Sequence, residues 1–360
     1  MRDNFILWLA VIALMAGFVS SCAPIDSEYY NADDFQTVKK IDVHFHYETL
    51  DDRYLLLADS LNFRLVSPNV DAGRSINEQL EIATELKRKY PDKFAFFGTF
   101  GVDQFGTEDF AGNIVSRIDT CMAAGASGIK IWKNIGMTLK DSVGNFVMAD
   151  DMAFAPVFTY MEEKNIPLLA HLGEPKNCWL PLEEMTLDND RSYFSNNPQY
   201  HMYLHPEAPS YEDQIRARDN LLERYPGIPF TGAHLGSQEW SIDEVARTLD
   251  RFPAYDVEFS ARIGHLQYQA ITEPEKVRDF LIKYQDRIMY GTDVGVTARN
   301  NNYAATVESL VKRWKDHFVW LATDAEVIVA DLDGKPVKGL QLPKEVIDKI
   351  YFANAEKFFR

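Results

Sequence analysis

The sequence has few cysteines and no cluster of basic residues. The first shortage argues against a fold held by disulfides, and the second argues against binding to nucleic acid. Three cysteines among 360 residues are too few for a disulfide-stapled fold, and we predict that Cys121 and Cys178 are free, buried thiols. The 37 Lys and Arg residues are outnumbered by 54 Asp and Glu residues, which gives a formal net charge of −17 at pH 7. An acidic surface without a basic face repels phosphate backbones, so we do not expect nucleic acid as a partner.

The sequence also lacks a glycine-rich dinucleotide fingerprint, which argues against a Rossmann domain, and it shows no internal repeat. It has an ordinary globular composition, 46% hydrophobic and 25% charged, in a chain long enough to bury a large core. A (β/α)8 barrel takes roughly 250 residues as one domain, so the length does not require two domains.

The N-terminus has the features of a lipoprotein signal peptide, which we place at residues 1–21. A charged start precedes an apolar run over residues 5–19, shorter than the roughly 20 residues that span a bilayer. The sequence Val-Ser-Ser-Cys that ends at Cys22 resembles a bacterial lipobox, so we expect a diacylglyceryl group on that thiol as the membrane anchor. Ala23 follows instead of Asp, which favours the outer membrane, facing the periplasm or the cell surface. Residues 22–40 are then a short polar tether.

From residue 41 to the end, short apolar segments alternate with segments of helical spacing, as in repeated β–α units of a parallel sheet. Eight expected strands in one series predict a closed TIM barrel, a single domain over residues 41–360, rather than an open sheet. Small hairpin insertions are predicted over residues 141–147 and 326–340. The expected strands are 41–44, 63–66, 94–100, 128–132, 167–171, 229–234, 256–260 and 288–293.

The loop over residues 172–210 is long for a connection between a strand and a helix. Loops of this length in compact domains are usually functional or disordered. Its aromatic residues, which include Trp179, Tyr200 and Tyr203, argue against disorder and suit stacking on a substrate ring, although core packing explains them as well. We therefore expect this loop to set the specificity of the protein.

The positions of the histidines carry the functional prediction. His44, His46, His171 and His234 lie at or just beyond the ends of expected strands, and Asp293 ends the last strand. Active sites of this barrel form where the strands end. The spacing of His44 and His46 puts both side chains on one face of a strand, where two imidazoles can bind one metal ion. The other histidines are expected to be structural, although the first two could enter the site through the long loop: His201, His205, His265 and His317.

Together these segments resemble the amidohydrolase superfamily and, within it, the amidohydrolase-related, ACMSD-like branch. The resemblance covers about residues 41 to 360. It rests on residues 42–46 (DVHFH), 128–134 (GIKIWKN), 169–175 (LAHLGEP), 232–236 (GAHLG), 289–293 (MYGTD) and a closing helix over 342–355.

The resemblance implies that one divalent metal ion binds to His44, His46, His171 and Asp293, with zinc the first expectation and Mn or Fe as alternatives. Asp293 would then take a proton from the metal-bound water and pass it to the leaving group. His234 would lie behind the ligands or hydrogen-bond the substrate carbonyl as charge develops.

Lysines of the fourth strand segment have an open role. In binuclear relatives a lysine at this strand is carbamylated and bridges two metal ions, whereas the mononuclear branch lacks the bridge. Lys130 or Lys133 would then contact the substrate, or Lys130 simply reaches the barrel mouth. Arg262 would pair with an anionic group through its bidentate fork, or lie on the surface.

These residues predict a metal-dependent hydrolase that cleaves a lactone, ester or amide bond in a small-molecule substrate. Substrate contacts are expected from Arg262, Trp179 and Glu174. A metal-dependent decarboxylase is the alternative, because the branch contains both activities, and a non-catalytic surface binding lipoprotein is a third hypothesis. Whether the chain forms a homo-oligomer is left open.

Overall fold

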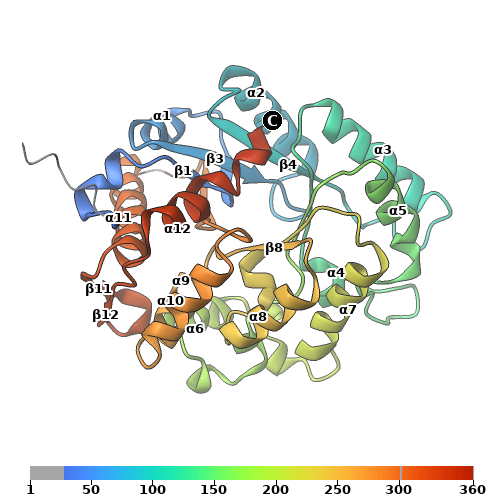
Figure 1. The fold of residues 1–360 in the computed structure, drawn as a ribbon. Helices are drawn as coiled ribbons and strands as arrows, with labels where there is room; N and C mark the ends of the chain where they lie inside the picture. The colour runs from blue at the N-terminus through green and yellow to red at the C-terminus, as the bar shows by residue number, and fades with distance from the viewer. Residues whose placement is uncertain (1–27, 301, 360) are drawn as a thin grey trace, which may run out of the picture.

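The structure is a computed structural model that describes residues 28–300 and 302–359. Its centre is a sheet of eight parallel strands, each paired with its neighbours in chain order (Figure 1). All eight predicted strands are present, so the chain folds as the predicted single-domain (β/α)8 TIM barrel. In pairing order the strands are β1 (Lys40–Asp42), β3 (Phe63–Pro68), β4 (Phe94–Thr99), β5 (Ile129–Ile131), β6 (Leu168–Ala170), β7 (Phe230–Gly232), β8 (Tyr255–Glu258) and β9 (Ile288–Met289).

A second pair of strands closes the ring between its first and last members. β2 (Phe45–Glu48) follows β1, β10 (Val294–Thr297) follows β9, and the two pair in parallel. In the gap before them, the backbone N–H of Asp293 donates to the carbonyl of His44 at 2.8 Å. The sequence predicted continuous strands over residues 41–44 and 288–293, whereas each strand is broken where the candidate ligands lie. We call this join the seam of the barrel.

Eight helices cover the outside of the ring, one after each barrel strand, and bury their apolar sides against the strands. In α2, for example, Leu80, Ala83 and Leu86 are buried, and Ser75 caps the helix by accepting from the N–H of Glu78. None of the helices in residues 28–300 and 302–359 is long and apolar enough to cross a membrane. The covering helices are α1 (Arg53–Ser60), α2 (Ile76–Lys89), α3 (Phe110–Ala123), α5 (Ala155–Glu163), α7 (Tyr211–Arg224), α8 (Ile242–Arg251), α10 (Pro274–Lys283) and α11 (Tyr303–Ala322).

The C-terminal segment closes the end of the barrel at which the strands begin. It runs across this end from α11 toward β4 (Figure 1). Phe358 packs on the apolar side chains of the barrel interior, with its ring 5.0 Å from that of Phe97. Glu28 lies beside this segment, since the N–H of Lys344 donates to the carbonyl of Glu28 at 3.0 Å. The closing elements are α12 (Lys344–Asp348), η9 (Lys349–Ala353) and η10 (Glu356–Phe359).

Part of the segment expected to be a polar tether is folded onto the barrel. It forms the short turn η1 (Ala32–Gln36), and both Phe35 and Val38 are buried. The ring of Phe35 lies 5.7 Å from that of Phe318 in α11. These two apolar residues in a polar stretch indicate that the segment packs against the barrel and is not a solvent-exposed tether. The predicted signal peptide and Cys22 lie outside the described residues.

Both predicted hairpins are present. Lys140 bridges to Phe146 in antiparallel fashion, and β11 (Glu326–Val329) pairs with β12 (Lys335–Lys338) through the short turn η8 (Ala330–Leu332). Cys121 and Cys178 are free and buried, which confirms the prediction from the sequence.

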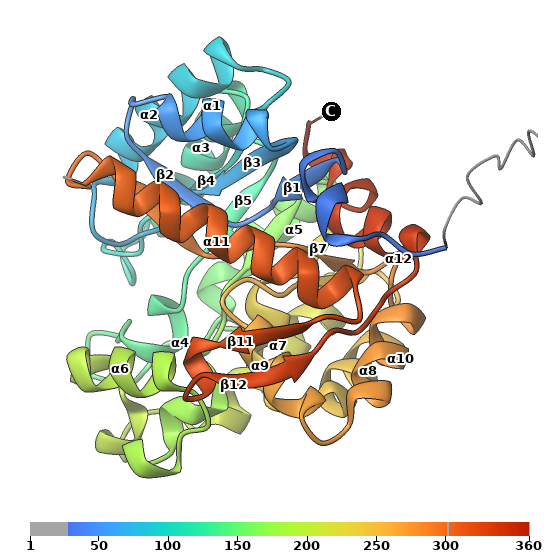
Figure 2. The ribbon, with the colours of Figure 1, turned by 90° about the vertical axis from the view of Figure 1, so that its left-hand side faces the viewer.

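The long loop over residues 172–210 is an ordered insertion after β6. Its side chains form a small apolar cluster around Cys178, Met185, Phe194 and Met202. The insertion carries α6, which lies on the side of the barrel away from α12 (Figure 2), so it flanks the end where the strands finish. Its elements are η3 (Lys176–Trp179), η4 (Leu182–Glu184), α6 (Asp188–Asn196), η5 (Pro198–Tyr200) and η6 (Met202–Leu204).

Candidate metal centre

Three of the predicted metal ligands converge at the seam. His44 lies in the break between β1 and β2, His46 lies on β2, and Asp293 lies in the break between β9 and β10. Nε2 of His46 is 3.1 Å and Nε2 of His44 is 3.4 Å from Oδ1 of Asp293. The three ligand atoms lie within 4.8 Å of one another, close enough to share one ion. Imidazole and carboxylate are ligand types that suit Zn, Mn and Fe.

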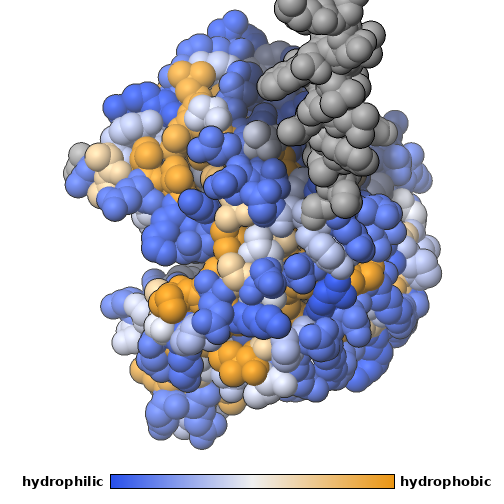
Figure 3. Space-filling view, turned by 60° about the vertical axis from the view of Figure 1, so that its left-hand side comes forward, coloured by the Kyte–Doolittle hydropathy of each residue, from blue (hydrophilic) through white to orange (hydrophobic). Residues whose placement is uncertain are grey.

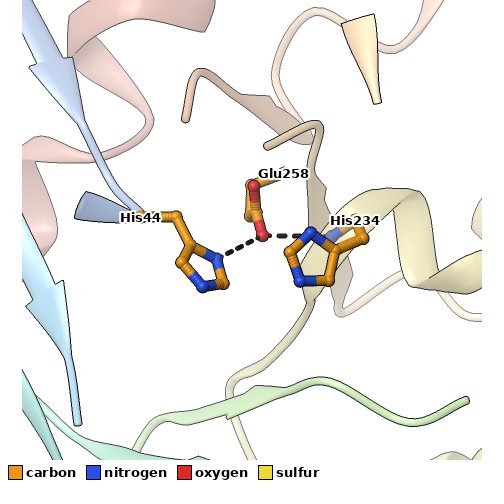
Figure 4. A group of neighbouring side chains, drawn as sticks. All are labelled: His44, His234 and Glu258. Carbon is orange, nitrogen blue, oxygen red and sulfur yellow. Dashed lines mark hydrogen bonds and ion pairs between the residues drawn. The ribbon is translucent and has the colours of Figure 1, made fainter. Parts of the chain in front are cut away.

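Glu258, the last residue of β8, holds His44 from behind (Figure 4). Its Oε1 accepts from Nδ1 of His44 at 2.9 Å and from the backbone N–H of His234 at 3.0 Å. Both carboxylate oxygens also accept from Ser260, one from its hydroxyl and one from its N–H. Burial acts to raise the pKa of Glu258, but the His44 ring holds it at about 2, so the group is a carboxylate. Because Nδ1 of His44 donates to Glu258, Nε2 is left for a metal ion.

The role of Glu258 was not predicted from the sequence. The signal was present, because an acidic residue between Val257 and Phe259, on a strand expected to be buried, needs a partner inside the barrel. The carboxylate, together with His44 and His234, forms a second group of close donor atoms. Its oxygens are already engaged by four donors, so we assign it to positioning rather than to metal binding.

His171 and His234 extend the row of imidazoles beside His44. The ring centroids of His44 and His234 are 4.9 Å apart, and those of His234 and His171 are 4.2 Å apart. Nδ1 of His171 lies 3.2 Å from Nε2 of His234. Nε2 of His171 is buried and has no hydrogen-bond partner among the described residues. A buried nitrogen without a partner is costly, and a metal ion would satisfy it. The residues present therefore fit a divalent ion, although His171 lies outside the group of His44, His46 and Asp293.

The four predicted ligands line one cavity of about 240 Å³. Figure 3 shows this side of the surface hollowed between the part that carries α1 and α2 and the part that carries α6. The cavity thus lies between the barrel strands and the insertion. Its other walls come from Val70, Lys130, Trp132, Lys133, Glu174, Pro175, Asn189, Asp190, Tyr193, Phe194, Ala261 and Arg262.

Two buried cations face this cavity, and neither donates a hydrogen bond to a carboxylate of the described residues. Lys130 on β5 is fully buried, its Nζ has no hydrogen-bond partner among the described residues, and burial lowers its pKa to about 8. Arg262 is 6% exposed, and its nearest carboxylate oxygen, on Glu174, is 3.9 Å away. Such groups attract an anionic or polarised oxygen, so the geometry favours contact with a ligand over a surface position for Arg262.

Lys133 ties the insertion to the rim of the barrel. Its ammonium forms an ion pair with Glu174 and donates to the hydroxyl of Tyr193 at 2.9 Å. It also lies 4.6 Å from the ring centroid of Tyr200. Both members of the ion pair are 4% exposed. Glu174 is therefore engaged with Lys133 in this state, and it also lies 3.4 Å from Nε2 of His171.

Other candidates lie away from the cavity. Trp179 packs its ring against Tyr211 at 5.5 Å and donates its indole N–H to a backbone carbonyl of the same insertion, behind the cavity wall. His234 lies behind His44 and His171 and is likewise absent from the described lining. His201 and His205 each hydrogen-bond a backbone carbonyl of the insertion, the structural role expected for them.

Comparison with known proteins gives one match to a family and several to solved structures. The model of a family described as amidohydrolase matches residues 41–360. No curated protein matches the chain.

Among solved structures, an uncharacterized TIM-barrel protein, Bb4693 from Bordetella bronchiseptica, aligns with a TM-score of 0.51 at 15% identity, over 89% of this chain and 98% of that one. The 5-carboxyvanillate decarboxylase of Novosphingobium aromaticivorans, solved with bound manganese, aligns with a TM-score of 0.45 at 14% identity, over 91% and 98%. The 4-oxalomesaconate hydratase of Rhodopseudomonas palustris aligns with a TM-score of 0.45 at 13% identity, over 89% and 95%. At these identities the first alignment supports the barrel fold alone.

Proposed function

Because the chain belongs to the amidohydrolase family, we propose that it is a metal-dependent hydrolase that cleaves a lactone, ester or amide bond in a small molecule. The observation that carries the proposal is the convergence of Nε2 of His44, Nε2 of His46 and Oδ1 of Asp293, with Nε2 of His171 in the same cavity and without a hydrogen bond among the described residues. A divalent ion held there, Zn²⁺ first and Mn²⁺ or Fe²⁺ as alternatives, would lower the pKa of a bound water and polarise a carbonyl.

The chain's own residues would divide the remaining tasks. Asp293 is the ligand we assign to proton transfer, because its side chain is 30% exposed toward the cavity, whereas that of His44 is 1% exposed. Lys130 and Arg262 would hold an anionic or carbonyl oxygen of the substrate, since the ammonium of Lys130 has no hydrogen-bond partner among the described residues and the guanidinium of Arg262 is 3.9 Å from its nearest carboxylate oxygen. The rings that line the cavity, such as Trp132, would pack on the apolar part of the substrate.

Metal analysis tests the site. Protein purified without chelator should contain about one divalent ion per chain, and the His44→Ala/His46→Ala double variant should contain none. His201→Ala/His205→Ala is the matched control, because these imidazoles lie in the insertion and bind backbone carbonyls. Wild-type protein that stays metal-free after reconstitution with Zn²⁺, Mn²⁺ and Fe²⁺ would remove the basis of the proposal.

The reaction is tested with a panel of lactones, esters, amides and aromatic carboxylic acids. Release of acid from one of the first three classes, lost in Asp293→Asn, supports the hydrolase. Release of CO₂ from a carboxylic acid instead identifies the alternative, a decarboxylase. Absence of turnover from metal-loaded protein across the whole panel, with tight binding of one compound, would favour a binding lipoprotein.

We also propose that Cys22 carries the lipid anchor. The support is the lipobox-like sequence alone, because residues 1–27 lie outside the described part of the chain. Cells fed radiolabelled palmitate should label the wild-type protein, and Cys22→Ala should abolish the label. Equal labelling of both proteins would exclude this anchor.

A further inference from the structure

The turn that carries His234 is strained. In η7 (Ala233–Ser237), the backbone of His234, Leu235 and Gly236 adopts φ near +60° and ψ from +28° to +43°. Ser237 follows with φ of +59°, so four consecutive residues occupy the left-handed region. Side chains other than glycine rarely adopt this conformation, and a run of such residues persists only where its surroundings enforce it. Holding the backbone of this turn in the left-handed region therefore lowers the stability of the fold.

Hydrogen bonds from four directions hold the turn. Arg218 donates to the carbonyl of Gly236 at 2.6 Å, and Tyr211 donates to the carbonyl of Ser237 at 2.7 Å. The hydroxyl of Ser237 donates to a carbonyl at the start of the insertion at 2.8 Å. The N–H of His234 donates to Glu258 at 3.0 Å. What these contacts fix is the position of the His234 ring, between β8 and His171.

The partners of that ring determine its tautomer. Nδ1 of His234 lies 2.9 Å from the backbone carbonyl oxygen of Ser260, which can only accept, so Nδ1 carries the proton. A neutral ring then presents a lone pair at Nε2, which faces Nδ1 of His171 at 3.2 Å. Nδ1 of His171 must donate to it, and the lone pair of His171 is left on Nε2. This nitrogen is buried on the cavity side and forms no hydrogen bond among the described residues, with Oε2 of Glu174 the carboxylate oxygen beside it at 3.4 Å.

We propose that His234 is a positioning residue that fixes the tautomer of His171 and does not touch the substrate. The inference rests on the proposed metal site, because the tautomer fixed by His234 leaves the Nε2 lone pair of His171 free to bind the metal ion. It explains why the ring of His234 lies behind the wall of the cavity rather than in it. It also explains the strained turn, since a ring rotated out of this turn would leave Nδ1 of His171 without its acceptor.

Two substitutions separate positioning from catalysis. His234→Gln keeps an amide oxygen that can accept from Nδ1 of His171, whereas His234→Leu keeps the bulk and removes the acceptor. Competition with a chromophoric chelator measures Zn²⁺ affinity, which should fall 10- to 100-fold in His234→Leu and be largely retained in His234→Gln. If both variants bind Zn²⁺ as the wild type does and both lose turnover, His234 acts on the substrate and the inference is wrong.

A second measurement needs neither metal nor activity. Long-range ¹H–¹⁵N spectra of the metal-free wild-type protein report which nitrogen of each histidine is protonated. They should show His171 protonated on Nδ1, and a proton on Nε2 would overturn the inference. This readout also stands if His234→Leu fails to fold. A wild-type protein that binds no metal but shows His171 protonated on Nδ1 would refute the proposed function. The inference that His234 fixes the tautomer of His171 would still hold.

Discussion

The indole N–H of Trp314 donates to Oδ2 of Asp42 at 3.0 Å, although the two residues are 272 positions apart. The same carboxylate accepts from the hydroxyl of Thr292 at 2.6 Å and from the backbone N–H groups of Thr292 and His44 at 3.0 and 3.2 Å. Asp42 thus satisfies donors at the seam that the broken strands leave unpaired. It ties the backbone beside Asp293 to that of His44.

Asp42→Asn should weaken the seam. The amide has only one oxygen for four donors, so its NH₂ group must face at least one N–H or O–H, and we expect a loss of about 1–3 kcal/mol in the free energy of unfolding. Urea denaturation of the metal-free protein measures it. Trp314→Phe is the control, because it removes one donor but leaves both N–H groups of the seam with their acceptor. A larger loss of unfolding free energy in Trp314→Phe than in Asp42→Asn would contradict this assignment.

Glu258→Gln should lower metal affinity 10- to 100-fold without unfolding the barrel. The amide accepts less strongly from Nδ1 of His44, and its NH₂ group must face either the three donors at Oε1 or the Ser260 N–H at Oε2, so the orientation of His44 is no longer fixed. Chelator competition measures the affinity, and Glu223→Gln, an exposed residue paired with Arg251, serves as the matched control. Unchanged Zn²⁺ binding in Glu258→Gln would show that the carboxylate does not position His44.

Acid should destabilise the fold through His317. Burial, helped by the charge of Arg313, lowers the pKa of this imidazole to about 3 from an ordinary value of 6.5. Below pH 6.5 the imidazole is protonated in the unfolded chain but stays neutral in the folded chain. The folded state therefore keeps its full stability above pH 6.5 and loses stability as the pH falls from 6.5 toward 3. For this partly exposed side chain we expect a loss of about 1–2 kcal/mol between pH 7 and pH 5.

The measurement compares urea unfolding of the wild type and His317→Gln at both pH values. The variant should lose correspondingly less stability on acidification, because it has no proton to gain at this position. His205→Gln, at a half-exposed position in the insertion, is the matched control. Identical pH dependence of wild type and His317→Gln would rule out this group as the source.

Lys133→Met should loosen the insertion. The substitution leaves Glu174 buried without its main counter-charge and removes the donor to Tyr193, so we expect a loss of about 3 kcal/mol. Hydrogen exchange should speed up in α6. The double variant Lys133→Met/Glu174→Gln should recover part of the stability, and a double variant as unstable as the single one would mean that the ion pair is not the cause.

The sequence was sufficient to predict the barrel, because the apolar segments that form its strands are short, regular and separated by helical spacing. It also predicted that His44, His46, His171 and Asp293 would meet, because parallel strands bring their ends to one edge. In the structure all four line the same cavity, although His171 lies outside the closest group.

The remaining features depend on where side chains point and which distant residues they contact, and no local sequence pattern encodes this. Glu258 points inward because of the pleat of β8, and its partners come from other strands. The left-handed turn at His234 contains only one glycine, Gly236, so its residue types do not indicate a run of positive φ angles. Trp179 was expected at the substrate because it is aromatic, yet the insertion has its own core, which lies against this ring. Long-range packing decided each of these.

The position of Glu28 bears on the direction in which a protein anchored through Cys22, as proposed, would face. Glu28 lies against the C-terminal segment that plugs the beginning of the barrel strands, whereas the cavity opens at their other end, beside the insertion. A protein anchored to a membrane through residues that precede Glu28 would have the opening of its cavity on the side away from that membrane. Its substrate would then arrive by diffusion from the surrounding fluid and not sideways out of a bilayer.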